Sequence, residues 1–249
     1  MTSFIFFALL SAHASAQTLP EACKRTGTDV LMALRDPNNQ LSFDNDGGLF
    51  DGGVCWWHTR FTRSAAYLAE FHPELPKLSD DDAVNAIHAI SELNEKVVIA
   101  GYANLKDFST DYQQEIQSQL NKWQIRNGFL HAAWIQDLEG HDSAPPDQLH
   151  DMIYGIASQF DQEKRPLFLF LRLKGVTSHA SLLIGYNFTS DGVALDVLDS
   201  NFTGTVTTFT YTEGMTSLDY HGTPYVPYVE FEDDFDQING ALQDACISS

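Results

Sequence analysis

Basic residues are scarce in this chain. Among its 249 residues, 14 lysines and arginines stand against 34 aspartates and glutamates, which gives a formal net charge of −20 at pH 7. A surface this negative repels the phosphate backbone of nucleic acids and the headgroups of anionic lipids. We therefore expect no nucleic-acid partner, and the charge is compatible with a basic peptide or protein as partner.

Long apolar runs are also absent. No stretch approaches the roughly 20 apolar residues that a membrane-spanning helix needs, so we expect no membrane insertion. The apolar run at residues 4–10 is followed by Ala-Ser-Ala at 14–16, a small-residue pattern that a signal peptidase cleaves. Residues 1–16 are therefore predicted to be a signal peptide, and the protein to be secreted or periplasmic. Because no lysine or arginine precedes the run, the alternative is the apolar N-terminus of a cytoplasmic protein.

Cysteine is rare, with three residues in the whole chain. In an exported protein, one disulfide bond would leave one thiol unpaired. Cys23 and Cys246 lie near the two ends of the mature chain, and the ends of a domain often lie close together, so we predict that these two form the bond. Cys55 then remains as a candidate reactive thiol. The alternative is that all three are reduced and buried as small apolar side chains.

The sequence has no internal repeat, no low-complexity segment and no Gly/Ser/Pro-rich linker, so residues 17–249 are predicted to form a single domain. Its first part, about 17–127, is predicted to be helical, and its second part, about 128–249, to be mostly antiparallel β-structure, which makes the fold class α+β. Residues 17–54 are expected to be mostly loop because turn-forming clusters recur there. The expected helices are residues 56–71, 80–95, 111–123 and 147–160, and the expected strands are 129–135, 167–173, 180–188, 193–198, 205–211 and 225–231.

Cys55 stands where a reactive thiol is expected. It follows Gly52 and Gly53, and it lies at or beside the start of the helix predicted over 56–71. The positive end of a helix dipole and its unpaired backbone N–H groups stabilise a thiolate and lower the pKa of the thiol. The backbone N–H of the same residue is suited to bind a developing oxyanion. The placement predicts a nucleophile.

A catalytic thiol also needs an oriented base. His179 begins a predicted strand, and a strand holds an imidazole more rigidly than a loop does. If the chain turns near residues 189–192, an antiparallel hairpin brings Asp199 back beside His179. We therefore predict Asp199 as the group that orients the imidazole, with Asn201 as the second candidate.

A metal site is the competing interpretation of Cys55. His58 lies three residues further on and so on the same helix face, which would suit a shared metal ion. No second pair of this kind is found among the nine histidines. We therefore predict no metal ion and no other cofactor.

Three segments together resemble the papain-like cysteine peptidase superfamily, particularly its bacterial members. They are GGVCWWHTRFTRSA, SHASLLIGY and VALDVLDSN, and the likeness covers residues 40 to 231. The resemblance implies a papain-like fold, with the nucleophile at a helix N-terminus in a helical lobe followed by an antiparallel sheet or barrel. It implies Cys55 as the nucleophile, His179 as the general base and acid, and Asp199 as the orienting residue.

The chain departs from that family at one position. The papain-like pattern places a glutamine about six residues before the nucleophile, where it completes the oxyanion hole, and here this position is Leu49. Asn45 and Gln40 are the candidate substitutes.

Together these features predict a secreted, papain-like cysteine hydrolase that cleaves amide bonds, with peptide or protein substrates first. The alternatives are an amidase, deamidase or acyltransferase with the same triad, or a catalytically inactive papain-like binding module. A secreted adhesion or inhibitor protein, in which Cys55 is simply buried, is the third.

Overall fold

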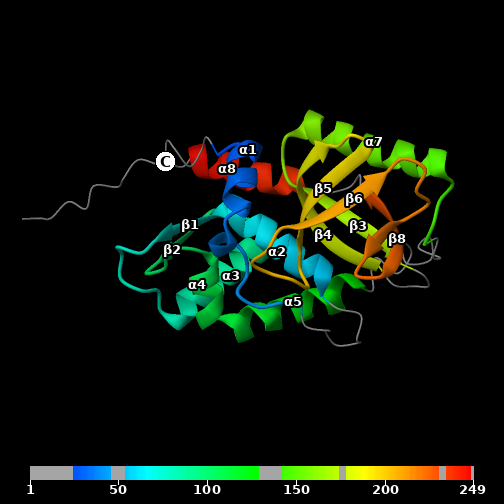
Figure 1. The fold of residues 1–249 in the computed structure, drawn as a ribbon. Coiled ribbons are helices and arrows are strands. Elements are labelled where there is room, and N and C mark those ends of the chain that lie inside the picture. Colours follow the sequence, from blue (N-terminus) through cyan, green and yellow to red (C-terminus); the bar gives the residue numbers. More distant parts are fainter. Residues whose placement is uncertain (1–24, 46–53, 129–141, 174–177, 230–233, 248–249) are drawn as a thin grey trace, which may run out of the picture.

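The computed structural model describes residues 25–45, 54–128, 142–173, 178–229 and 234–247. These residues form a mixed α+β fold, with a helical part beside a curved antiparallel sheet (Figure 1). The predicted fold class is confirmed at this level. Cys23, Leu49 and the strand predicted over residues 129–135 lie outside the described residues.

The helical part is built around one long buried helix. It consists of α1 (Gly27–Leu34), the 3₁₀ turn η2 (Pro37–Asn39), α2 (Cys55–Leu68), α3 (Asp80–Glu92), α4 (Leu105–Asp111) and α5 (Gln113–Gly128), with the short strands β1 (Ala69–His72) and β2 (Val97–Ala100). Side chains of α2 such as Trp57 and Phe61 pack with those of α3, α4 and α5 in one core. Eleven of the fourteen residues of α2 are buried, so this helix is fixed from several sides.

The second part is a six-stranded antiparallel sheet. Its strands are β3 (Leu167–Leu173), β4 (Ser178–Phe188), β5 (Gly192–Asp199), β6 (Thr207–Thr212), β7 (Leu218–Tyr220) and β8 (Thr223–Val229), in the spatial order β6-β5-β4-β3-β8-β7. The two edge strands, β6 and β7, also contact each other, so the sheet is nearly closed. Closure of this kind leaves few unpaired strand edges.

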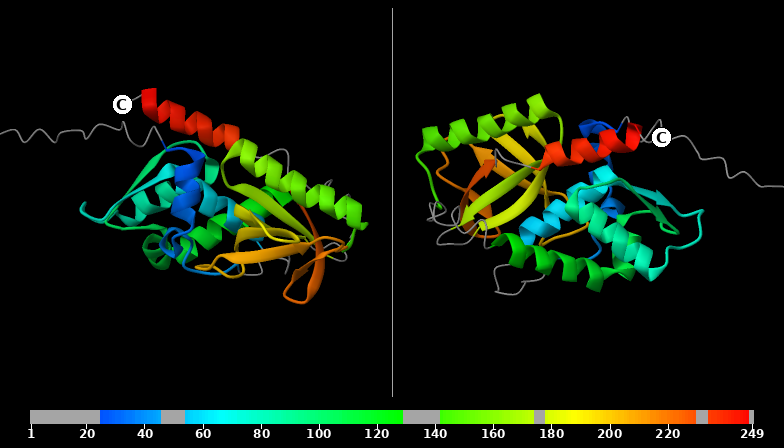
Figure 2. Two further views of the ribbon diagram at one scale, coloured as in Figure 1. Left: turned by 45° about the horizontal axis from the view of Figure 1, so that its top comes forward. Right: turned by 180° about the vertical axis from the view of Figure 1, so that it is seen from behind.

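The side chains of β3 alternate between the two faces of the sheet, and each face packs against different helices. Leu167, Leu169 and Leu171 share a core with α7 (Pro146–Glu163), which lies along the sheet (Figure 2). Phe168 and Phe170 point to the other face, where they pack with residues of α1, α2 and α8 (Phe235–Ile247). Because side chains alternate across a strand, one apolar run serves both cores. Helix α2 therefore lies between the helical core and the sheet.

The C-terminal helix is joined to α2 by ion pairs. Asp234, which immediately precedes α8, accepts from the guanidinium groups of Arg60 and Arg63, both on α2. The side chain of Arg63 has no exposed surface, and its guanidinium also lies 3.9 Å from the ring centroid of Phe168. A carboxylate this close compensates two charges that are otherwise costly to bury.

Several elements differ from the sequence predictions, and α4, β1 and β2 are among those that were not predicted. The segment predicted as loop contains α1, whose start is fixed by reciprocal hydrogen bonds between Thr26 and Asp29, a capping box that we did not anticipate. Helix α2 ends at Leu68, because the next residues pair with β2 as a parallel strand. Strand β7 and helix α8 were not predicted. In the described part of the chain, no helix is long and apolar enough to cross a membrane.

Candidate active site

Cys55 is the first residue of α2, and it is the free cysteine of the described residues. The preceding residue, Val54, offers no side-chain cap, so backbone N–H groups of the first turn are available to other acceptors. The side chain of Cys55 is partly exposed. One turn further along, Thr59 Oγ1 donates to the carbonyl oxygen of Ala180 at 3.2 Å. That bond fixes the start of α2 against the beginning of β4.

The environment of Cys55 lowers the pKa of its thiol. Burial raises this pKa, but the hydrogen bond and charge of His179 outweigh it, with further help from the backbone N–H groups of Ala180 and Trp56. The positive end of the helix acts in the same direction. A thiol with a lowered pKa is present as the nucleophilic thiolate over a wider pH range.

His179 lies between Cys55 and Asp199. Its Nε2 donates to Asp199 Oδ1 at 2.7 Å, which leaves Nδ1 for the thiol. Both side chains are buried, with 6% of His179 and 2% of Asp199 exposed. Burial lowers the pKa of His179, but the bonds to Asp199 and Cys55 raise it more, to about 9. The arrangement therefore favours an imidazolium beside a thiolate.

The sheet register explains how Asp199 reaches His179. In the β4–β5 hairpin, Asp199 is opposite Ser181, two residues from His179, and the register shifts between Leu183 and Gly185. A diagonal neighbour on the same face of the sheet is within reach of a histidine side chain. Burial raises the pKa of Asp199, but the bond to His179 and the N–H of Asn201 lower it by more than burial raises it. The carboxyl is therefore ionised at neutral pH.

Asn201, the second candidate for orienting His179, has a different position. Its backbone N–H donates to Asp199 Oδ1 at 2.8 Å, and its side chain points to other partners. It therefore stabilises the carboxylate and does not contact the imidazole. Tyr220, which the sequence analysis missed, packs its ring 5.2 Å from that of His179, and its hydroxyl also lowers the pKa of Asp199.

Neither candidate for the oxyanion hole is free in this structure. Asn45 Oδ1 accepts from the N–H of Val54 at 2.9 Å, and its Nδ2 donates to Asn201 Oδ1. Gln40 is buried, with Nε2 donating to the carbonyl oxygen of Leu34 and Oε1 accepting from the N–H of Gly204. Backbone N–H groups at the start of α2 lie beside the thiol and are suited to bind an oxyanion.

His58 does not join Cys55 in a metal site. Its Nε2 donates to the carbonyl oxygen of Phe43 at 2.9 Å, and only 2% of the residue is exposed. Within the described ranges, no group of three or more His, Cys, Asp or Glu side chains is arranged to hold a metal ion. His58 is a structural residue that ties α2 to the segment before it.

Burial lowers the pKa of His58 to about 4, and this predicts a loss of stability in acid. Between pH 6.5 and about 4 the unfolded chain binds a proton here that the folded chain does not, so the free energy of unfolding falls as the pH falls. The loss is about 3 kcal/mol. A His58→Gln variant, whose amide retains a donor for Phe43, should lack this part of the acid loss. Urea unfolding of both proteins from pH 7 to 4 measures it, and parallel curves would contradict the assignment.

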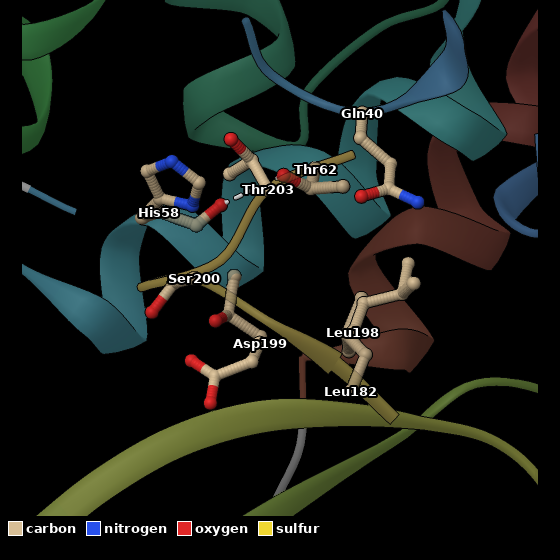
Figure 3. A pocket seen from close by; sticks show the side chains of 9 residues that line it. Gln40, His58, Thr62, Leu182, Leu198, Asp199, Ser200 and Thr203 are labelled. Atoms are coloured by element: carbon tan, nitrogen blue, oxygen red, sulfur yellow. Dashed lines mark hydrogen bonds between the residues drawn. The ribbon is translucent and has the colours of Figure 1, made fainter. Parts of the chain in front are cut away.

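A small cavity of about 10 Å³ lies behind Asp199, between the helical part and the sheet (Figure 3). Gln40, His58 and Thr62 border it on one side, and Leu182, Leu198 and Asp199 on the other. This space is about the size of one water molecule. It is too small to hold a peptide or another molecule of similar size.

No protein-family model matches this chain, and neither the curated proteins nor the solved structures contain a match.

Proposed function

We propose that the protein is a cysteine hydrolase that cleaves amide bonds, with Cys55 as nucleophile, His179 as base and acid, and Asp199 as the orienting group. The observation that supports this most directly is the position of His179, which is hydrogen-bonded to the thiol on one side and to Asp199 on the other. A nucleophile, a base and a group that orients the base are the parts that thiol catalysis requires.

In the proposed reaction the Cys55 thiolate attacks the carbonyl carbon of the amide. Backbone N–H at the start of α2 stabilises the oxyanion that forms. When the C–N bond breaks, the imidazolium of His179 gives its proton to the leaving amine, and a thioester remains. His179 then takes a proton from water, which attacks the thioester and releases the carboxylic acid and the thiol. Asp199 keeps the imidazole in the productive tautomer throughout.

Two features of the fold support the papain-like part of the proposal. The nucleophile begins a buried central helix, and the base and its partner come from adjacent strands of an antiparallel sheet packed against that helix. For substrates we propose peptides or proteins, and the net charge of −20 favours basic ones through electrostatic attraction. We further propose secretion, with a Cys23–Cys246 disulfide bond.

Alkylation of Cys55 tests this proposal without a known substrate. The purified protein is treated with iodoacetamide between pH 4 and 9, and the modified Cys55 peptide is quantified by mass spectrometry. An ordinary thiol is only about 0.3% thiolate at pH 6, so its rate falls steeply below pH 8. We expect Cys55 to react rapidly at pH 6. Once a substrate is found, hydrolysis should decline above about pH 9, where His179 loses the proton that the leaving amine needs.

The control is the same chain unfolded in guanidinium chloride, in which Cys55 should titrate as an ordinary thiol. If the folded and unfolded proteins show the same pH profile, Cys55 is not activated and the proposal fails.

The position of Asn45 and Gln40 supports a second candidate, a binding module that has lost catalysis. Both side chains are engaged within the protein, so neither donates to an oxyanion in this structure. Such a module would keep a reactive thiol but would not turn over. An activated acyl donor such as a p-nitrophenyl ester separates the two, since only the hydrolase releases many equivalents of nitrophenol per Cys55.

A further inference from the structure

Two asparagine side chains connect the nucleophile helix to the orienting carboxylate. Asn45 Oδ1 accepts from the backbone N–H of Val54, the residue before Cys55, at 2.9 Å. Asn45 Nδ2 donates to Asn201 Oδ1 at 3.0 Å, and Asn201 Nδ2 donates to the hydroxyl oxygen of Tyr220 at 2.9 Å. We call this chain of Val54 N–H, Asn45, Asn201 and Tyr220 the amide relay.

Each member of the amide relay has only one possible orientation. A backbone N–H only donates, so Asn45 must place its oxygen toward Val54 and its NH₂ toward Asn201. Asn201 then accepts with its oxygen and donates with its own NH₂. The donation therefore runs in one direction along the relay, and bonds aligned in this way polarise and strengthen one another. The proton of the Tyr220 hydroxyl is left for another acceptor, and the Tyr220 ring lies 5.2 Å from that of His179.

Further hydrogen bonds join the two chain segments that carry Asn45 and Asn201. The segment of residues 40–45 lies along the turn that follows β5, where the backbone N–H of Asn45 donates to the carbonyl oxygen of Ser200 at 2.6 Å. Asp44 accepts from the backbone N–H of Thr203 at 2.8 Å and from its hydroxyl at 2.7 Å. The same turn supplies the N–H of Asn201 that binds Asp199. Movement of this segment would therefore disturb both Cys55 and Asp199.

We infer that Asn45, Asn201 and Tyr220 act as a unit of positioning residues that sets the Cys55 thiol and the Asp199 carboxylate in their reactive arrangement. The inference rests on the proposed function. At one end, Asn45 fixes the peptide that enters α2 and so places the thiol near the first-turn N–H groups and His179. At the other end, the backbone N–H of Asn201 binds the carboxylate that orients His179, and the ring of Tyr220 packs against the imidazole. None of the three touches the reacting sulfur atom.

Three variants break successive links: Asn45→Ala, Asn201→Ala and the conservative Tyr220→Phe. In each, we expect alkylation of Cys55 at pH 6 to be about 2- to 10-fold slower, the effect of one lost hydrogen bond. The pH of half-maximal rate should also rise, which a loss of global stability alone would not cause. The double variant Asn45→Ala/Asn201→Ala should be no slower than the slower single variant, because members of one unit are not additive.

Asn39→Ala is the matched control. Asn39 lies just before the same segment and makes one side-chain bond, from Nδ2 to the carbonyl oxygen of Ala33, but it is not part of the relay. Its pH profile should equal that of the wild type.

Three outcomes would each overturn the inference. They are unchanged pH profiles in the relay variants, additive effects in the double variant, and a lowered melting temperature with no shift of the pH profile. If the alanine variants do not fold, Tyr220→Phe alone decides it. A wild-type protein whose Cys55 behaves as an ordinary thiol would instead refute the proposed function, so the two failures are distinguishable.

Discussion

Replacing His179 with alanine should slow the alkylation of Cys55 at pH 6 by about 10- to 100-fold. Without the imidazolium, burial of the thiol is no longer offset, and the pKa of Cys55 rises toward or above that of an ordinary thiol. An ordinary thiol has only about 0.3% thiolate at this pH. The more basic thiolate is a better nucleophile, with a Brønsted coefficient of about 0.4 to 0.5, so the rate falls less than the thiolate fraction does. Amide hydrolysis should fall further, by about 10²- to 10⁴-fold, because the general acid and base is also lost.

His88→Ala is the control for this experiment, since His88 is exposed on α3, away from the site. Asp199→Asn adds a second test, because it removes the charge that raises the pKa of His179 while retaining the shape of the side chain. An alkylation profile of His179→Ala that coincides with that of the wild type would show that the pair is not functional.

Asp234→Ala should cause the largest loss of stability of any single change that we consider, about 3 to 5 kcal/mol. The substitution removes the carboxylate shared by Arg60 and Arg63, whose side chains are 12% and 0% exposed, and so takes an ion pair from each of two largely buried guanidinium groups. The guanidinium of Arg60 lies 4.4 Å from the ring centroid of Trp123, so tryptophan fluorescence should report the change. Urea unfolding at pH 7 measures the free energy difference.

Asp236→Ala provides the comparison, because Asp236 is an aspartate two residues after Asp234, in the first turn of α8, and is exposed. Its effect should stay within about 1 kcal/mol, as for most surface positions. Equal effects of the two substitutions would mean that the cluster at Asp234 contributes no more than an ordinary surface charge.

The sequence was sufficient to predict that Cys55, His179 and Asp199 lie together, because the position of each has a local cause. Cys55 follows a glycine-rich turn and begins a helix, and the hairpin between β4 and β5 brings Asp199 back toward His179. Whether Asp199 or Asn201 orients His179 depends on the pairing register of β4 and β5. The position of the turn does not determine this register alone. The shift between Leu183 and Gly185 shows why counting from the turn was only approximate.

The residues around the triad could not be predicted in this way. Tyr220 belongs to a three-residue edge strand that meets His179 only because the sheet is nearly closed. Asn45 and Gln40 were considered as oxyanion donors, but their partners, Asn201 and Gly204, lie more than 150 residues away in sequence. Contacts between such distant residues follow from tertiary packing, and no local pattern encodes them.

The ion pairs of Asp234 also have a consequence for the order of events during synthesis. Arg63 and Asp234 are separated by 171 residues, so α2 is made long before Asp234 exists. At about 5 to 20 residues per second, this delay is roughly 10 to 30 s. Until then, α2 carries two guanidinium groups that oppose its burial. The thiol at the start of α2 is therefore not yet in its folded environment. We therefore expect Cys55 in a nascent chain to reach its final surroundings only after Asp234 has been synthesised.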